Sequence, residues 1–304
     1  MIQFNTDLIL LDGNEGDDVF PEKFSNEIYY SNEDAYCSVS YESNISIKYI
    51  INGTETYRVG DRGIRVHGGT YLLVNDGRWV ECLPGHGSEA ISVFLNKNVV
   101  QDVINVYGRK NRQLLDLPFE DGGIHFEFME YPFGQNDLLG AALKRLHRGI
   151  MRDGVPQTRF VEETYFSIAE AMVFSQDKVR RQVERIDKVK RATREELFRR
   201  LLTARDFLAS TSRYHFNFDT VCAHSGLSKF HLIRLFKSVF GITPYRYYLH
   251  CKVEDAKKSL RDKSLKIHHV AYDCGFTDVY SFSKRFKGIT GISPSQYRKD
   301  ILGF

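Results

Sequence analysis

The sequence predicts an α+β protein, with an antiparallel β-barrel in the first half and an all-α region in the last third. Three patterns indicate this class: apolar residues that alternate early in the chain, a helical period after Pro132, and a helical segment that occurs twice near the end. The chain has 304 residues, of which 42% are hydrophobic, which suits about two domains. No apolar run approaches the roughly 18 residues of a membrane span, and no basic segment precedes the short apolar patch near the start. We therefore expect a cytoplasmic protein with no membrane partner.

The β pattern extends from Cys37 to about Phe94. It consists of short β-branched or aromatic runs separated by turn residues, namely Cys37–Tyr41, Asn44–Ile51, Thr54–Val59, Thr70–Asn75 and Ala90–Leu95. Asn52-Gly53 predicts a hairpin, because a type I′ turn needs a positive φ at both central residues. Several short strands at close spacing favour an antiparallel barrel or sandwich. We also expect a short helix over Lys97–Tyr107 and a last strand over His125–Met129.

Two amphipathic helices are expected after Pro132. The first spans Asn136–Ile150, with Asn136 as its cap, and the second runs from Thr158 to about Gln176. Their apolar stripes are Leu138, Leu139, Ala142, Leu143, Leu146 and Ile150 in the first, and Val161, Tyr165, Ile168, Ala169 and Met172 in the second. Each stripe suits either packing on the barrel or a dimer interface. The charged stretch between Asp177 and Arg194 predicts a domain boundary.

Charge is distributed unevenly along the chain. Residues 191–304 contain 21 Lys and Arg against 10 Asp and Glu, a net charge of +11. The other 190 residues contain 21 against 29, a net charge of −8. A basic domain of this size is the electrostatic footprint of a protein that binds a polyanion, since Lys and Arg release counterions from phosphates.

A segment of about thirty residues occurs twice in the basic part. The first copy begins at Phe218 and the second at Ile267. Three residues of the first copy recur 49 positions later and six recur 50 positions later: Val221, Gly226 and Leu227 as Val270, Gly275 and Phe276, and Phe236, Lys237, Gly241, Ile242, Pro244 and Tyr247 as Phe286, Lys287, Gly291, Ile292, Pro294 and Tyr297. This similarity indicates a duplicated supersecondary unit.

Each copy predicts a short helix, a glycine turn and a second helix, over about 219–240 and 267–290. In the first copy we expect Asp219 to cap the short helix, Gly226 to form the turn, and Ser228 to cap a helix over Lys229–Phe240. Its expected buried stripe is Leu232, Leu235, Phe236 and Val239, and its outer face is Phe230, His231, Ile233, Arg234, Lys237 and Ser238. This is a helix-turn-helix arrangement, in which the second helix enters the major groove of DNA.

The second copy has the same plan. Gly275 forms the turn, and the second helix opens near Thr277 or Asp278 and buries Phe282 and Phe286. The residues left outside are Tyr280, Ser281, Ser283, Lys284 and Lys287.

These motifs closely resemble the AraC/XylS family of bacterial transcription regulators. The most specific part is the Gly275-Phe276 turn followed by SFSKRFK and GISPSQYR, and the resemblance is strong over Glu195–Asp300. It extends weakly over the first half, where many family members have a small cupin-like barrel. The resemblance implies a cupin-like effector and dimerisation domain over 1–180, a linker over 181–193 and a DNA-binding domain over 194–304. It also implies a rigid linker helix, here Tyr245–Leu260, between two helix-turn-helix units that enter successive major grooves.

Helix geometry agrees with that implication. Recognition helices in successive grooves lie about 34 Å apart. A linker helix of some sixteen residues spans about 24 Å, and the flanking helices add the remainder.

Matching to the family's base-reading positions gives candidate contacts to double-stranded DNA. These are Phe230, Ile233 and Arg234 in the first unit, and Tyr280, Ser281, Ser283 and Lys284 in the second. Arg234 suits guanine O6 and N7, while Phe230 and Ile233 suit thymine methyl groups. For Phe230 and Tyr280 the alternative is packing on the domain's own core. Candidate phosphate contacts are Ser228, Lys229, Lys237 and Lys287.

The first half carries weaker functional signals. Arg58 and Arg62 flank the Gly60 turn and suit an anionic effector, and Trp79 beside Arg78 suits a ring, although solvated arginines are the simpler interpretation. His67, His86 and His125 are isolated, whereas cupin enzymes carry an H-x-H pair. The five cysteines include no CxxC pair. We therefore expect no catalytic residues, no metal and no cofactor.

The favoured function is an effector-responsive transcription regulator, most simply an activator. We expect it to bind DNA through residues 194–304 and to form a homodimer through its first half. The family resemblance adds RNA polymerase as a partner. The alternative is a cupin-type metal enzyme fused to a DNA-binding domain. The identity of the effector stays open.

Overall fold

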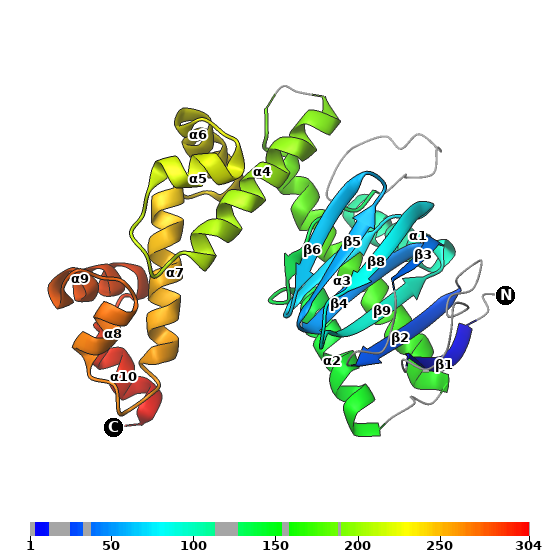
Figure 1. Ribbon diagram of the computed structural model, residues 1–304, viewed down its shortest axis with the longest axis horizontal. Helices are drawn as coiled ribbons and strands as arrows, with labels where there is room; N and C mark the ends of the chain where they lie inside the picture. Colours follow the sequence, from blue (N-terminus) through cyan, green and yellow to red (C-terminus); the bar gives the residue numbers. More distant parts are fainter. Residues whose placement is uncertain are drawn as a thin grey trace. The chain divides into compact units, whose positions relative to one another are not determined.

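A computed structural model describes residues 4–11, 25–32, 38–112, 127–153, 158–187 and 190–303. The chain divides into two compact units, Met1–Arg180 and Arg181–Phe304 (Figure 1). The division falls inside helix α3, which ends at Glu184, so the charged stretch expected to be a linker begins as helix. Within the described residues, no helix is long and apolar enough to cross a membrane.

The N-terminal unit consists of two facing β-sheets. The six-stranded sheet has the order β1-β2-β9-β4-β7-β10, and the four-stranded sheet has the order β3-β8-β5-β6. The strands are β1 (Phe4–Leu11), β2 (Asn26–Asn32), β3 (Val39–Ser43), β4 (Ile45–Asn52), β5 (Thr54–Val59), β6 (Arg62–His67), β7 (Thr70–Val74), β8 (Arg78–Pro84), β9 (Glu89–Leu95) and β10 (Phe133–Gly134). All paired strands are antiparallel except β1 and β2, which are parallel.

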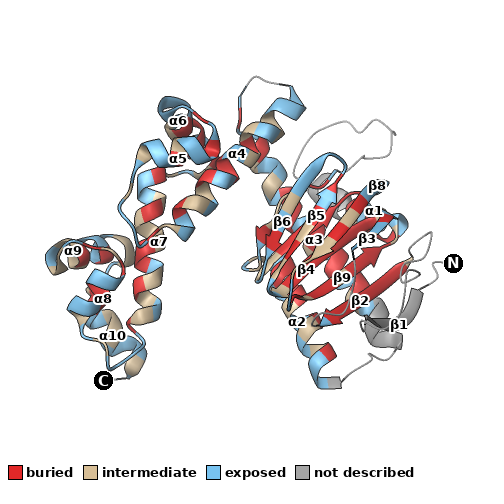
Figure 2. Cartoon of the chain, viewed as in Figure 1, coloured by how far each residue is buried: buried red, intermediate tan, exposed pale blue. Residues whose placement is uncertain are grey.

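The core of this unit lies between the two sheets. Strand β4 pairs with β9 and β7, and it is buried from Ile45 to Ile50 (Figure 2). The four-stranded sheet is buried on one side only, so β5 alternates between exposed or half-buried and buried residues. The interior contains mainly apolar and aromatic side chains: Tyr29, Tyr41, Ile50, Tyr57, Val59, Val66, Leu72, Val74, Val80, Cys82, Ala90 and Phe94.

The expected Asn52-Gly53 hairpin is wrong. Gly53 does have a positive φ of 75°, but β4 and β5 belong to different sheets and do not pair. The chain turns a corner between the sheets here, and a Cβ at Gly53 would lie 2.8 Å from the Cα of Ser88. The two-residue hairpin forms instead at Gly60-Asp61, where Val59 pairs with Arg62.

Among the described residues of this unit, three helices accompany the sheets: α1 (Lys97–Arg112), α2 (Leu138–Asp153) and α3 (Thr158–Glu184). The expected stripes on α2 and α3 are buried within this unit, where Leu143 and Ala169 are 0% exposed. Of the two interpretations, the structure therefore shows intramolecular packing. Leu138 is an exception, because it begins α2 and is 62% exposed, and the side chain of Val161 lies outside the described set.

Two further local predictions differ from the structure. Residues 127–129 are not in a strand, and His125 lies outside the described residues; the short strand β10 comes later. Asp137, not Asn136, caps α2, since its Oδ1 accepts a hydrogen bond from the backbone N–H of Gly140 at 2.8 Å.

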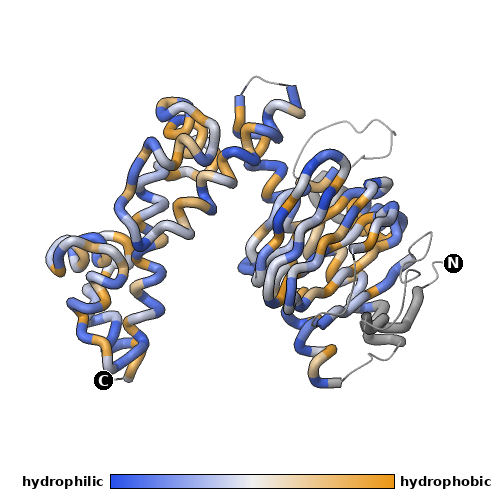
Figure 3. Tube along the Cα trace, viewed as in Figure 1, coloured by the Kyte–Doolittle hydropathy of each residue, from blue (hydrophilic) through white to orange (hydrophobic). Residues whose placement is uncertain are grey.

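The regular elements that the structure describes in the C-terminal unit are all helices. Its helices are α4 (Arg191–Ser210), α5 (Phe218–Ser225), α6 (Lys229–Phe240), α7 (Pro244–Ser259), α8 (Ile267–Asp273), α9 (Val279–Thr290) and α10 (Pro294–Leu302). Helix α7 is the central element, with α5 and α6 near one end and α8, α9 and α10 near the other (Figure 1). Hydrophilic and hydrophobic segments alternate along α4 and α7, as expected for helices that bury one face (Figure 3).

Candidate nucleic-acid interface

The first helix-turn-helix unit is formed by α5, Gly226 and α6. Gly226 ends α5 with φ 64°, in the left-handed region that suits glycine. Asn217, not the expected Asp219, caps α5, because its side chain accepts hydrogen bonds from the N–H groups of Asp219 and Thr220. Ser228 occupies the N-cap position of α6, although its side chain makes no capping bond.

Helix α6 buries the predicted stripe and exposes the predicted face. Its buried residues are Leu232, Leu235, Phe236 and Val239. Phe230 is 76% exposed, Arg234 is exposed, and Ile233 is half-buried. The exposure of Phe230 rules out the alternative in which its ring packs on the core. It leaves an aromatic side chain and a guanidinium on one outward face.

The second unit repeats this geometry with a more regular cap. Gly275 has φ 73°, and the Asp278 carboxylate accepts a hydrogen bond from the backbone N–H of Ser281 at 2.7 Å, a bond that lowers the pKa of Asp278. Phe282 and Phe286 are fully buried, whereas Tyr280 is 77% exposed. Ser281 and Ser283 are half-buried beside the exposed Lys284. Both copies thus present an aromatic residue near the start of the second helix and a cation four residues later.

The candidate phosphate contacts surround these faces. Ser228, Lys229, Lys237 and Lys287 are all exposed. Lys229 also lies 5.0 Å from the centre of the Phe218 ring, which keeps its ammonium near the start of both α5 and α6.

The turn of the second helix-turn-helix unit packs against α7 and against the loop between α4 and α5. Lys252 on α7 is 4% exposed, and its Nζ donates a hydrogen bond to the carbonyl of Gly275. A Cβ at Gly275 would lie 1.9 Å from the carbonyl oxygen of Arg213, in the loop between α4 and α5. Ser212 in the same loop donates a hydrogen bond to Asp255 on α7 at 2.8 Å. These contacts, which the sequence did not reveal, fix the Gly275 turn against α7 and the loop between α4 and α5.

Comparison with known proteins gives the same assignment for this region. A family model described as a helix-turn-helix domain matches residues 221–300. Over 82 residues the chain is 34% identical to a probable transcription factor, PqrA, of Proteus vulgaris, and the match spans 27% of this chain and 67% of that protein. The chain belongs to the AraC family of transcription regulators.

Other AraC-type relatives match over the same region. The chain is 36% identical over 86 residues to the HTH-type transcriptional activator AarP of Providencia stuartii, covering 28% of this chain and 64% of that protein. It is 35% identical over 83 residues to the MmsAB operon regulatory protein of Pseudomonas aeruginosa, covering 27% of each. The matches thus span between about a quarter and two thirds of these relatives. A solved AraC-type regulator from Chromobacterium violaceum is 27% identical, with coverage of 33% and 88% and a TM-score of 0.31.

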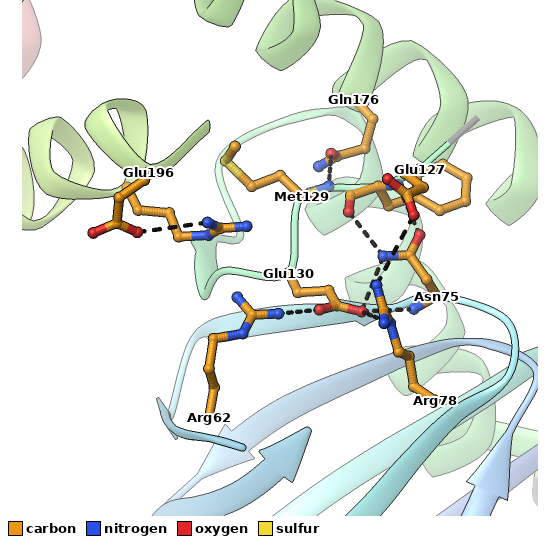
Figure 4. Close-up of polar contacts among 10 residues, drawn as sticks. Arg62, Asn75, Arg78, Glu127, Met129, Glu130, Gln176 and Glu196 are labelled. Carbon is orange, nitrogen blue, oxygen red and sulfur yellow. Dashed lines mark hydrogen bonds and ion pairs between the residues drawn. The ribbon is translucent and has the colours of Figure 1, made fainter. Parts of the chain in front are cut away.

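The predicted effector residues lie on the four-stranded sheet of the N-terminal unit. Arg58 pairs with Glu81, and Arg62 pairs with the buried Glu130. Arg78 also contacts Glu130, with Nε 3.2 Å from Oε1 (Figure 4). An anion at these arginines would therefore compete with carboxylates of the chain itself.

Glu130 lies in the segment before α2 and connects that segment to the four-stranded sheet through Arg62 and Arg78. Its carboxylate accepts hydrogen bonds from Asn75 as well, through the side chain at 3.0 Å and the backbone N–H at 3.3 Å (Figure 4). The Trp79 side chain makes none of the hydrogen bonds described for Glu130 and is 60% exposed. Of the four residues predicted to bind an effector, the three arginines are thus in ion pairs and Trp79 is an exposed ring.

The isolated histidines of the first half have ordinary surroundings where they are described. His67 is exposed, and its Nδ1 lies 2.9 Å from the Thr54 hydroxyl, while His86 is exposed. Among the residues that the structure describes, no group of three His, Cys, Asp or Glu side chains is placed to hold a metal ion.

Proposed function

We propose that this protein is a sequence-specific transcription regulator that reads two successive major grooves with α6 and α9. The observation that carries the proposal is the pair of exposed faces, Phe230 with Arg234 and Tyr280 with Lys284, on second helices of two helix-turn-helix units. Arg234 forks onto guanine, while Phe230 and Ile233 contact thymine methyl groups. Ser281, Ser283 and Lys284 supply single hydrogen bonds on the second groove.

The phosphate contacts account for most of the affinity. Lys229, Lys237 and Lys287, with the Ser228 hydroxyl, hold the backbone on either side of the base-reading faces. The basic half has a net charge of +11, so binding releases counterions and weakens steeply with salt.

The whole protein acts in the cytoplasm as an effector-responsive regulator, and activation through RNA polymerase is the simplest mode. The N-terminal unit binds the effector and forms the dimer, and we propose no catalytic activity for it. A homodimer would place four recognition helices on a pair of half-sites.

Selection of binding sites from random duplexes tests this proposal. We expect the full chain to enrich a sequence with two specified segments about one helical turn apart. Its affinity should fall by orders of magnitude between 50 and 200 mM salt. Enrichment of no sequence, or binding that is unchanged by salt, would contradict the proposal.

A further inference from the structure

The two helix-turn-helix units share one helix, α7. It packs against α6 of the first unit and against α8 and α9 of the second. Residues 241–243 connect α6 to α7, whereas the longer segment 260–266 connects α7 to α8. A connection of that length does not by itself fix the orientation of the second unit. Its orientation therefore depends on noncovalent contacts with α7.

An apolar core joins α7 to the second unit. Its buried members include Val253 and Ala256 on α7 and Phe282 and Phe286 on α9. Burial of apolar surface is largely non-directional, whereas a hydrogen bond also depends on the angle at which donor and acceptor meet. A hydrogen bond between α7 and the second unit would therefore add orientation to this packing.

Lys252 on α7 makes such a hydrogen bond. The residue is buried, and its Nζ donates to the carbonyl of Gly275, in the turn before α9. The ring centres of Tyr248 and Phe276 lie 4.9 and 5.0 Å from Nζ. Burial lowers the pKa of Lys252, and the carbonyl and the two rings offset part of the cost of burying the ammonium.

The first unit has a similar contact that involves a different helix. Nη1 of Arg200 on α4 donates a hydrogen bond to the Gly226 carbonyl at 3.3 Å. Arg200 is exposed, and its Nε lies 3.0 Å from the Glu196 carboxylate. Arg200 thus connects the first turn to α4, whereas Lys252 connects the second turn to the helix that both units share. Of these two contacts, that of Lys252 bears on the position of α9 relative to α6.

We propose that Lys252 is a positioning residue that sets the distance and rotation between α6 and α9, and thereby the spacing of the two DNA segments that the protein accepts. This rests on the proposed function, in which both helices enter the same DNA. Gly275 lies just before Asp278, the N-cap of α9, so a shift of the turn moves the start of that helix. A methionine would fill the same space without burying a charge, so the lysine contributes orientation rather than stability.

Duplexes with altered spacing test this proposal on the full chain. Two base pairs inserted between the segments of the selected site shift the second segment by about 7 Å and rotate it by about 70°. We expect the wild type to lose at least about ten-fold in affinity for this duplex, and Lys252→Met to lose about three-fold or less. Fluorescence anisotropy gives the ratio of the two Kd values for each protein. A general loss of stability cancels in that ratio, so a merely structural role would not change it.

Three control variants should keep the wild-type ratio. Lys252→Arg retains a cationic donor at the same position. Arg200→Met removes the similar contact of the first turn. Lys258→Met changes a side chain of α7 that is 76% exposed.

A second variant at the same position guards against a failure to fold. The amide nitrogen of Lys252→Gln is one atom closer to the backbone than Nζ, so we expect the ratio to fall as in Lys252→Met. A folded Met or Gln variant with the wild-type ratio, failure of both to fold, or an equal fall in Arg200→Met would each overturn the inference alone. A wild-type chain without a spacing preference would contradict the proposed function and this inference together.

Discussion

Two exposed cations on the recognition helices have different expected roles. Arg234 has a planar fork that matches guanine O6 and N7, whereas Lys287 is a point charge suited to phosphate. We expect Arg234→Ala to cost about 1 to 3 kcal/mol and to relax preference at one base pair per half-site. Lys287→Ala should weaken specific and non-specific DNA alike and lower the salt slope by about 1. Binding-site selection checks both, and unchanged base preferences in Arg234→Ala would show that the assignment is wrong.

Lys48 on β4 is 0% exposed, and we expect it to make the free energy of unfolding of the N-terminal unit depend on pH. Its pKa in the folded chain, about 7, is below the ordinary value of 10.5. Between these values the unfolded chain binds more protons, so the free energy of unfolding should rise as pH increases from 7 toward 10. Urea denaturation at pH 7 and pH 9 measures this rise, and Lys48→Met is expected to lack it. Equal pH dependence of the free energy of unfolding in wild type and variant would show that Lys48 does not cause it.

Among the elements of the C-terminal unit, the Gly275 turn of the second helix-turn-helix unit depends on the loop between α4 and α5. Gly275 and Gly241 both have a positive φ, of 73° and 78°, so alanine strains the backbone at either position by roughly 1 to 2 kcal/mol. Only at Gly275 does the added Cβ meet the Arg213 carbonyl, at 1.9 Å, whereas at Gly241 the space is open. Gly275→Ala should therefore destabilise the C-terminal unit far more than Gly241→Ala in thermal unfolding. A similar decrease in melting temperature for both variants would show that the backbone at Arg213 shifts to accommodate the added Cβ at little cost.

Elements whose signals are local were predicted closely from the sequence. The apolar period of α6 and the flanking Ser228 and Gly241 give its bounds, Lys229–Phe240, and its buried stripe. The cap of α5 was misplaced, from Asn217 to Asp219, because either side chain suits an N-cap and only the backbone conformation decides between them.

Features that depend on tertiary partners were not predictable. The Asn52-Gly53 pair predicts a turn, but which sheet each flanking strand joins depends on long-range pairing. Strand β6 was missed because it has only two apolar residues, Ile64 and Val66, between polar ones. Strand β8 was missed because the exposed Trp79 stands next to the buried Val80, which hides the alternation. In the sequence Lys252 resembles an ordinary surface lysine of a helix, and only the tertiary structure shows its hydrogen bond to the Gly275 carbonyl.

For the whole molecule, dimerisation remains a proposal that must use a surface other than the predicted stripes. Phe166 and Phe174 lie on one side of α3, about two turns apart, and are 41% and 38% exposed. We expect the double substitution Phe166→Ser and Phe174→Ser to shift the full chain from dimer to monomer in sedimentation, since an exposed apolar face favours a partner. A wild-type chain that sediments as a monomer at high concentration would contradict dimerisation, and a variant that stays dimeric would move the interface elsewhere.

In the proposed function, α6 and α9 read successive major grooves on one face of DNA. Hydroxyl-radical footprinting of the full chain on its selected site tests this most directly. We predict two protected patches per half-site, about one helical turn apart on the same face, with Arg234→Ala altering base preference in one patch and Lys284→Ala in the other. A single patch per half-site, or two patches on opposite faces, would show that α6 and α9 do not read successive grooves on one face.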